Sequence, residues 1–79
     1  MKIRIEYFAL LKDQRGQDQE VLETSATTPA ALYEELRTAH NFTLPKTNLK
    51  VAINEDFADW DTPLEENDTL VFIPPVAGG

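Results

Sequence analysis

Hydrophobic and polar residues alternate at the start of the chain, and this pattern predicts a half-buried strand over residues 2–10. The apolar residues of one parity are Ile3, Ile5 and Tyr7. The residues between them are charged and are expected to face solvent. Phe8 departs from the pattern, because its parity places an aromatic ring on the polar side of the strand.

A polar connection and a second strand follow the first one. Residues 11–18 contain Gly16 and are expected to link two elements of structure. Residues 19–24, with the sequence QEVLET, are expected to form the second strand. The two strands are therefore expected to pair as an N-terminal hairpin.

One helix is predicted after the hairpin. Thr28 followed by Pro29 is a favourable start, since a hydroxyl can cap the helix and proline is accepted at the first helical position. The apolar residues that recur at helical spacing are Leu32, Leu36 and Ala39, with Tyr33 beside them. The opposite face carries Glu34, Glu35 and Arg37. The helix is expected to end near residues 40–41.

Two further strands are predicted in the second half of the chain. Residues 49–53 alternate between polar and apolar types and form the first of them. Residues 55–68 are expected to be irregular, because they contain a proline and a run of turn-forming residues. Residues 69–73, with the sequence TLVFI, form the last strand, which Pro74 and Pro75 terminate.

The predicted order of elements is β-β-α-β-β, which places the chain in the α+β class. One main helix can cover one face of a mixed sheet of four or five strands and leave the other face open to partners. The β-grasp, or ubiquitin-like, fold satisfies this order with short connections. In that fold the first and last strands lie side by side in parallel, an expectation that comes from the fold and not from the sequence. Residues 1–75 are expected to form this domain, and residues 76–79 a flexible tail.

Composition limits the partners and the chemistry. The formal net charge of −7 and the pI near 4.4 disfavour nucleic acid and anionic membranes and favour basic partners, although acidity can also serve solubility alone. Cysteine is absent, so no disulfide, thiolate metal ligand or thiol nucleophile is available. No apolar stretch has the length of a membrane span, and no signal-peptide pattern precedes the first strand. A cytoplasmic protein is therefore expected.

No catalytic constellation stands out in the sequence. The only histidine, His40, lies at the predicted helix end, where a cationic side chain interacts favourably with the helix dipole. Glu65, Glu66 and Asp68 lie in a predicted turn, where solvated charge is the ordinary explanation. We therefore expect no metal site and no cofactor bound by this chain, and it does not look like a stand-alone enzyme.

The C-terminal residues are the strongest functional candidates. Two of the three glycines are Gly78 and Gly79. Pro74 and Pro75 are expected to keep the chain extended where it leaves the last strand. Residues 75–79 could then reach roughly 16 Å, and glycine, which has no side chain, can enter a narrow channel. Such a tail would present the α-carboxylate of Gly79 to another protein.

Two chemical steps would turn that carboxylate into a sulfur donor. A carboxylate is a poor electrophile, but adenylation supplies a good leaving group. Sulfide from a partner can then displace AMP and leave a thiocarboxylate, which is a nucleophile at sulfur. This chemistry needs no cysteine in the chain.

These residues resemble the small, sulfur-carrying subunits of molybdopterin synthase, the MoaD type. The resemblance extends over essentially the whole chain, and the ending Phe-x-Pro-Pro-Val-x-Gly-Gly is its most specific part. The matching segments are Tyr7-Phe8-Ala9, Gly16, and residues 51–54, 61–64 and 67–79.

The resemblance implies a cycle of loading and transfer. A ubiquitin-activating-like adenylyltransferase, which uses ATP and Mg²⁺, adenylates Gly79, and a sulfur donor then forms the thiocarboxylate. The large synthase subunit receives the loaded tail and supplies the catalysis, so this chain acts as a non-catalytic carrier. Sulfur passes there to cyclic pyranopterin monophosphate in molybdenum cofactor biosynthesis. The inserted residues are Pro74, Pro75, Val76, Ala77 and Gly78, followed by Gly79.

A docking surface is predicted beside the tail. The resemblance implies hydrophobic contacts with a partner at positions that match Phe8, Phe57 and Ile73. Parity on the last strand independently places Val71 and Ile73 opposite the core side, and exposed apolar residues of this kind mark partner sites. Family members often carry arginine where this chain has Lys12, so a positive charge is kept for a partner contact but bidentate pairing is lost. The alternative is that loops cover these strand residues.

Three other functions remain open at this point. A thiamine-pathway sulfur carrier shares the fold and the tail chemistry, although the two prolines and the Phe8-Ala9 opening favour the molybdopterin type. A ubiquitin-like protein modifier would join Gly79 to lysines of target proteins. An acidic interaction module would have an incidental tail.

Overall fold

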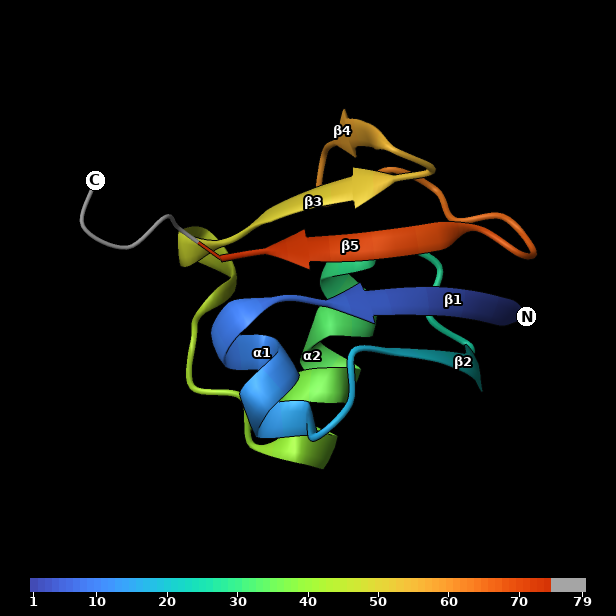
Figure 1. Cartoon of the computed structure of the whole chain (residues 1–79). Helices are drawn as coiled ribbons and strands as arrows, with labels where there is room; N and C mark the ends of the chain where they lie inside the picture. The colour runs from blue at the N-terminus through green and yellow to red at the C-terminus, as the bar shows by residue number, and fades with distance from the viewer. Residues whose placement is uncertain (75–79) are drawn as a thin grey trace.

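A computed structural model describes residues 1–74 and arranges them as a five-stranded mixed sheet with two helices (Figure 1). The strands are β1 (Lys2–Tyr7), β2 (Gln19–Glu23), β3 (Lys50–Ile53), β4 (Asp56–Ala58) and β5 (Thr69–Ile73). The helices are α1 (Ala9–Arg15) and α2 (Pro29–His40), and a 3₁₀ turn, η1 (Lys46–Asn48), precedes β3. The strands lie in the order β2-β1-β5-β3-β4.

The predicted β-grasp arrangement is confirmed. β1 pairs antiparallel with β2 and parallel with β5, so the first and last strands lie side by side at the centre of the sheet. β3 pairs antiparallel with β5 on the other side. Parallel neighbours require a crossover, and here the crossover includes the main helix.

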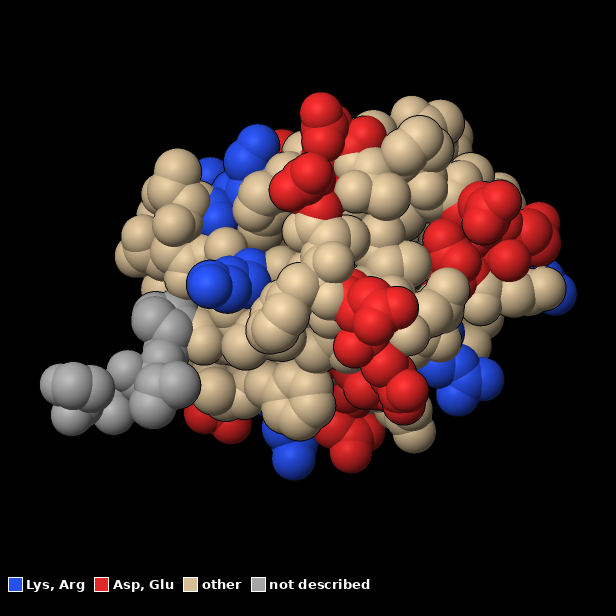
Figure 2. All heavy atoms as spheres, turned by 90° about the horizontal axis from the view of Figure 1, so that it is seen from above, with Lys and Arg blue, Asp and Glu red and all other residues tan. Residues whose placement is uncertain are grey.

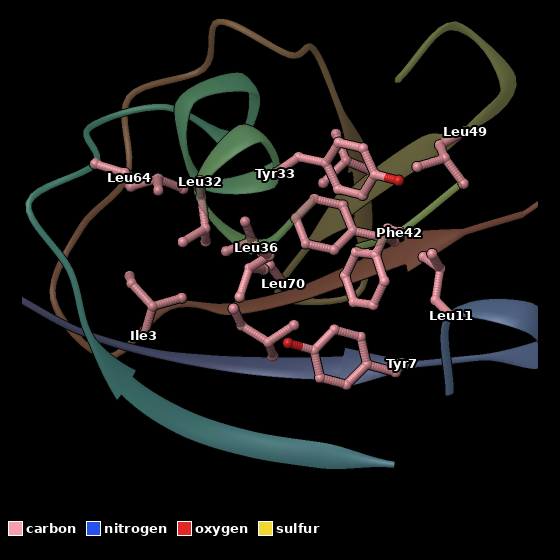
Figure 3. Close-up of a cluster of buried hydrophobic side chains, with 14 residues drawn as sticks. Ile3, Tyr7, Leu11, Leu32, Tyr33, Leu36, Phe42, Leu49, Leu64 and Leu70 are labelled. Atoms are coloured by element: carbon pink, nitrogen blue, oxygen red, sulfur yellow. The ribbon is translucent and has the colours of Figure 1, made fainter. Parts of the chain in front are cut away.

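One face of the sheet carries the hydrophobic core (Figure 3). The buried strand residues are Ile3, Ile5, Tyr7, Val51, Leu70 and Phe72. Helix α2 packs Leu32, Tyr33 and Leu36 against them, and α1 adds Leu11. The aromatic rings of Tyr33 and Phe72 lie 5.2 Å apart between centroids, a distance typical of a favourable aromatic pair.

Helix α2 begins and ends close to where the sequence predicted. The Thr28 hydroxyl accepts a hydrogen bond from the Ala31 N–H, and Pro29 occupies the first turn. Asn41 ends the helix in the left-handed conformation, and its N–H donates to the Arg37 carbonyl. The assignment of Ala39 to the core face was wrong, because this residue is exposed in the last turn of α2.

The prediction of a plain connection over residues 11–18 was wrong as well. Most of this segment belongs to α1, a helix of seven residues that follows β1 directly. Leu11 is fully buried and holds the helix against the sheet, and Gly16 ends it with a φ of 85°. The first strand therefore ends at Tyr7, three residues earlier than the alternating pattern suggested.

The segment predicted to be irregular contains a short strand. β3 and β4 form a hairpin with a two-residue turn, Asn54-Glu55, in which both φ values are positive, 51° and 77°. Positive φ at both central residues is typical of the type I′ turn that suits the twist of hairpin strands. The sheet therefore has five strands, within the predicted range of four to five.

Candidate functional site

The sheet face opposite α2 carries an apolar row across three strands. In the pairing register, Val71 of β5 lies beside Ala52 of β3, and Ala52 lies beside Phe57 of β4. Paired residues in a sheet point to the same face. The prediction that Val71 and Ile73 lie opposite Phe72 is therefore confirmed, since Phe72 is buried and its two neighbours are partly exposed. Phe57 is 72% exposed.

Phe8 extends this row at the end where β5 finishes. Its backbone is extended, with φ −130° and ψ 153°, so it continues β1 by one residue before α1 begins. Tyr7 pairs with Phe72, and one further step along the two parallel strands brings Phe8 beside Ile73. Phe8 is 49% exposed. We call the four residues Phe8, Phe57, Val71 and Ile73 the open-face patch.

One charged side chain, that of Lys50, borders the open-face patch. Lys50 pairs with Ile73 across β3 and β5, and its ammonium lies 5.8 Å from the centroid of the Phe57 ring. Lys12 is exposed on α1. Pro74, the last described residue, follows Ile73 directly. We call the end of the sheet at which β5 finishes the Pro74 end.

The remaining predicted site residues cannot be placed in the fold. Pro75, Val76, Ala77, Gly78 and Gly79 lie outside the described residues, as does the predicted domain boundary. Their roles stay predictions. The described part of the site thus consists of the open-face patch, Lys12 and Pro74.

Two residues beside the patch escaped sequence analysis. Leu10 is 41% exposed in the first turn of α1, and the helix itself was not foreseen. Lys50 was read only as the polar residue of an alternating strand. Its parity with Ile73 could have placed it on the open face once the pairing of β3 with β5 was known.

A partly buried ion pair holds α1 to the sheet. The Arg15 guanidinium donates from Nε and Nη2 to the two carboxylate oxygens of Glu20, at 2.8 and 3.0 Å. The Tyr7 hydroxyl donates to the same carboxylate at 2.6 Å. These hydrogen bonds, led by those from Arg15, lower the pKa of the Glu20 carboxyl, while burial and the neighbouring carboxylate raise the pKa of Tyr7. The helix that follows Phe8 is therefore fixed at its far end.

The opposite end of the open face is polar. Arg4, Glu6, Asn54, Glu55, Asn67, Thr69 and Val71 line a shallow hollow there. The expectation that Asp68 is a solvated turn residue was wrong. Asp68 is only 7% exposed, and its carboxylate accepts hydrogen bonds from the Asn54 amide at 2.9 Å and the Glu65 N–H at 2.8 Å. This residue joins the two turns at that end of the sheet.

The described residues contain neither a metal-binding group of side chains nor a membrane-spanning helix. Between residues 1 and 74, no three His, Asp or Glu side chains come together as a metal-binding group. Within the same range, neither helix has the length and apolar character needed to cross a bilayer.

The order and pairing of the strands, with the main helix across one face, define a ubiquitin-like β-grasp protein. The chain belongs to the ThiS family, whose sequence model matches residues 5–79. Among its relatives, the molybdopterin synthase sulfur carrier subunit of Escherichia coli is 28% identical over 80 residues, covering 98% of this chain and 99% of that protein. The class is thus that of the ThiS/MoaD-type ubiquitin-like sulfur carriers.

Solved structures share the fold at lower identity. SAMP1 from Haloferax volcanii superimposes with a TM-score of 0.80 at 21% identity, and the match covers 100% of both chains. A chain in the complex of subunits 1 and 2 of the molybdopterin-converting factor from Helicobacter pylori superimposes with a TM-score of 0.71 at 22% identity, again over 100% of both chains.

Proposed function

We propose that this protein is the sulfur-carrier subunit of a molybdopterin synthase. The observation that carries the proposal is the ending Phe-x-Pro-Pro-Val-x-Gly-Gly, which continues from a central strand at the edge of an exposed apolar face. The similarity to the Escherichia coli carrier subunit over nearly the full length supports this function over others of the same fold.

The chemistry proceeds in two steps on Gly79. A carboxylate oxygen attacks the α-phosphorus of ATP on an adenylating partner with Mg²⁺, and pyrophosphate leaves. Sulfide delivered by a donor protein then attacks the carbonyl carbon, and AMP leaves. The product is a thiocarboxylate at the C-terminus. No residue of the chain needs to act as acid, base or metal ligand in either step.

Transfer takes place on a second partner, the large synthase subunit. The thiocarboxylate sulfur bonds to a side-chain carbon of cyclic pyranopterin monophosphate as a carbon–oxygen bond at that carbon breaks. Hydrolysis of the resulting thioester leaves the sulfur on the pterin as a thiol and returns Gly79 to a carboxylate. Two such transfers provide the two sulfurs of the dithiolene. The carrier must dissociate and be reloaded between them, so both partners have to recognise it in turn.

The open-face patch provides the docking surface in this proposal. Burial of the Phe57 ring in a pocket of a partner is expected to contribute strongly to the binding free energy, because the ring is largely in contact with water in the free protein. The Helicobacter pylori structure, in which a protein of this fold is in complex with a second subunit, supports assembly with a large subunit.

Loading of sulfur can be measured by intact mass spectrometry. We expect incubation with the adenylating enzyme, ATP, Mg²⁺ and a sulfur donor to replace one oxygen of the chain by one sulfur. Deletion of Gly79 is expected to abolish both loading and molybdopterin formation, because the reacting carboxylate moves one residue closer to the fold. Thermal unfolding serves as the control and should be unchanged, since the deletion leaves residues 1–74 intact. Molybdopterin formation by the deleted chain would refute the proposal.

Two other outcomes would indicate one of the alternative functions. Loaded protein that supports thiazole formation but no molybdopterin would indicate a thiamine-pathway carrier. A ladder of conjugates in cell extracts, lost on deletion of Gly79, would indicate a protein modifier.

A further inference from the structure

The Pro74 end of the sheet carries three of the four lysines of the chain. Lys50 begins β3 and pairs with Ile73, the residue before Pro74. Lys46 lies in η1, immediately before β3. Lys12 lies on α1, which starts at the same end because β1 and β5 are parallel.

These lysines keep their charge available to a partner. The ion pairs within residues 1–74 join the Met1 amino group to Glu23, Arg15 to Glu20, and Arg37 to Glu34. Lys46 and Lys50 instead hold their ammonium groups 5.8 Å from the ring centroids of Trp60 and Phe57. An aromatic face orients an ammonium group but does not cancel its charge.

Several carboxylates lie at the end of the sheet opposite these lysines. Glu55 and Asp56 lie at the β3–β4 turn, and Glu65 and Glu66 lie in the turn before β5, both at the opposite end of the sheet. In Figure 2, blue groups occur on the left side, which is the Pro74 end, and also at the lower right, while the largest red groups lie at the centre, the upper middle and the right. Near the Pro74 end, Asp13 follows Lys12 on α1, and Asp59 follows β4 at the position opposite Lys50. Both sides of this end are therefore mixed in charge, but the ion pairs within residues 1–74 include none of these lysines.

We propose that Lys46 and Lys50, with Lys12 across the sheet, form a basic rim that recognises carboxylates around the apolar pocket of each partner. The inference rests on the proposed function and specifies the partner surface for it. The net charge of −7 alone would favour a basic partner. At physiological ionic strength, however, screening over about 8 Å leaves the local charges around the contact to decide its orientation.

The rim can fix the orientation in which the docking surface meets its partner, which the apolar residues alone do not do. Phe57 and Ile73 could enter a hydrophobic pocket in more than one rotation. A carboxylate of the partner beside Lys50 on β3 selects one of them, because Lys50 lies next to both residues.

Two double variants with the same net charge test the proposal. Lys46→Gln with Lys50→Gln removes the β3 side of the rim, and Lys2→Gln with Arg4→Gln removes two exposed cations at the other end of the sheet. The association rate is measured by stopped flow with the large synthase subunit and with the adenylating enzyme of the same organism, over a range of salt concentrations. We expect the rim variant to associate about tenfold more slowly at low salt and to depend less on salt, and the control to change less than twofold.

A third variant, Lys46→Arg with Lys50→Arg, keeps the charge and is expected to restore the rate. It also separates charge from packing, since Lys46 covers the Trp60 ring. Equal losses in the two glutamine variants would show that only net charge matters and would overturn the rim. A faster association of the rim variant would overturn it too. If the unmodified chain binds neither partner, the proposed function fails and the rim with it.

Discussion

At the scale of single residues, the side chain of Glu20 connects three elements of the fold. Its carboxylate receives three hydrogen bonds, two from Arg15 and one from Tyr7, and thereby joins β2, α1 and β1. Sequence analysis could not find this contact, because Glu20 and Arg15 look like ordinary exposed residues of a strand and a connection. The pairing depends on a helix that only the folded chain forms.

Replacement of Glu20 by glutamine is expected to lower the free energy of unfolding by about 1–3 kcal/mol at neutral pH, because Arg15 loses its ionised partner. The lowered pKa of Glu20 stabilises the fold above the ordinary glutamate pKa of 4.5, and this contribution disappears as the pH falls through the lowered value. The difference between wild type and Glu20→Gln should therefore shrink below pH 4.5. Urea unfolding between pH 7 and 3 measures it.

Glu23→Gln is the matched control on the same strand. Its carboxylate is 69% exposed and pairs only with the amino terminus, so the loss should stay within about 1 kcal/mol. An equal deficit of Glu20→Gln at pH 3 and pH 7 would contradict the assigned role of its charge.

At the scale of elements, the longest were predictable and the shortest were not. Helix α2 carries a clear capping signal and a buried stripe, and β5 is followed by two prolines, so both were found within a residue. Helix α1 has only seven residues, and so short a helix is unstable by itself. Burial of Leu11 and two hydrogen bonds between Gln14 and Thr43 stabilise it, and neither is visible in the sequence.

The β3–β4 hairpin was missed for a different reason. A type I′ turn usually carries glycine at its second central position, and this chain has Glu55 there with a φ of 77°. A residue with a side chain is strained in that conformation, by roughly 1 kcal/mol. The turn forms nonetheless, because Asn54 is hydrogen-bonded to Asp68 and to both backbone groups of Thr69.

Glu55→Gly is therefore expected to raise the free energy of unfolding by up to about 0.5 kcal/mol, the strain released less the entropy that glycine adds to the unfolded chain. Glu34→Gly, the same substitution on the exposed face of α2, is expected to lower it by about 1 kcal/mol. Denaturant titrations of both variants give the comparison. A loss of stability in Glu55→Gly would mean that the Glu55 side chain itself supports the hairpin.

At the scale of the whole molecule, the two faces of the sheet differ in how far their apolar residues are buried. Its α2 side holds the core, and its other side holds the open-face patch. The sequence predicted this division through Val71 and Ile73, since strand parity alone separates them from Phe72. The lysines at the Pro74 end were not recognised, because their proximity depends on strand order.

Substitution of one phenylalanine on each face of the sheet tests this difference. Phe72→Ala should lower the free energy of unfolding by about 3–5 kcal/mol, because its ring is fully buried in the core. Phe57→Ala should change stability by less than about 0.5 kcal/mol and yet weaken binding of the large synthase subunit by more than about tenfold. Chemical unfolding and titration calorimetry measure the two effects. A comparable loss of stability in both variants would place Phe57 in the folding core.

The central position of β5 also bears on how the protein is made. The ribosome synthesises β5 after every other element, yet β1 and β3 both pair with it. The nascent chain can form α2 early, but its sheet stays divided until β5 has left the exit tunnel. Prematurely terminated chains that lack β5 therefore have no assembled sheet and no complete docking face, and they are exposed to proteases. Only chains translated at least to Ile73 can compete for the partners.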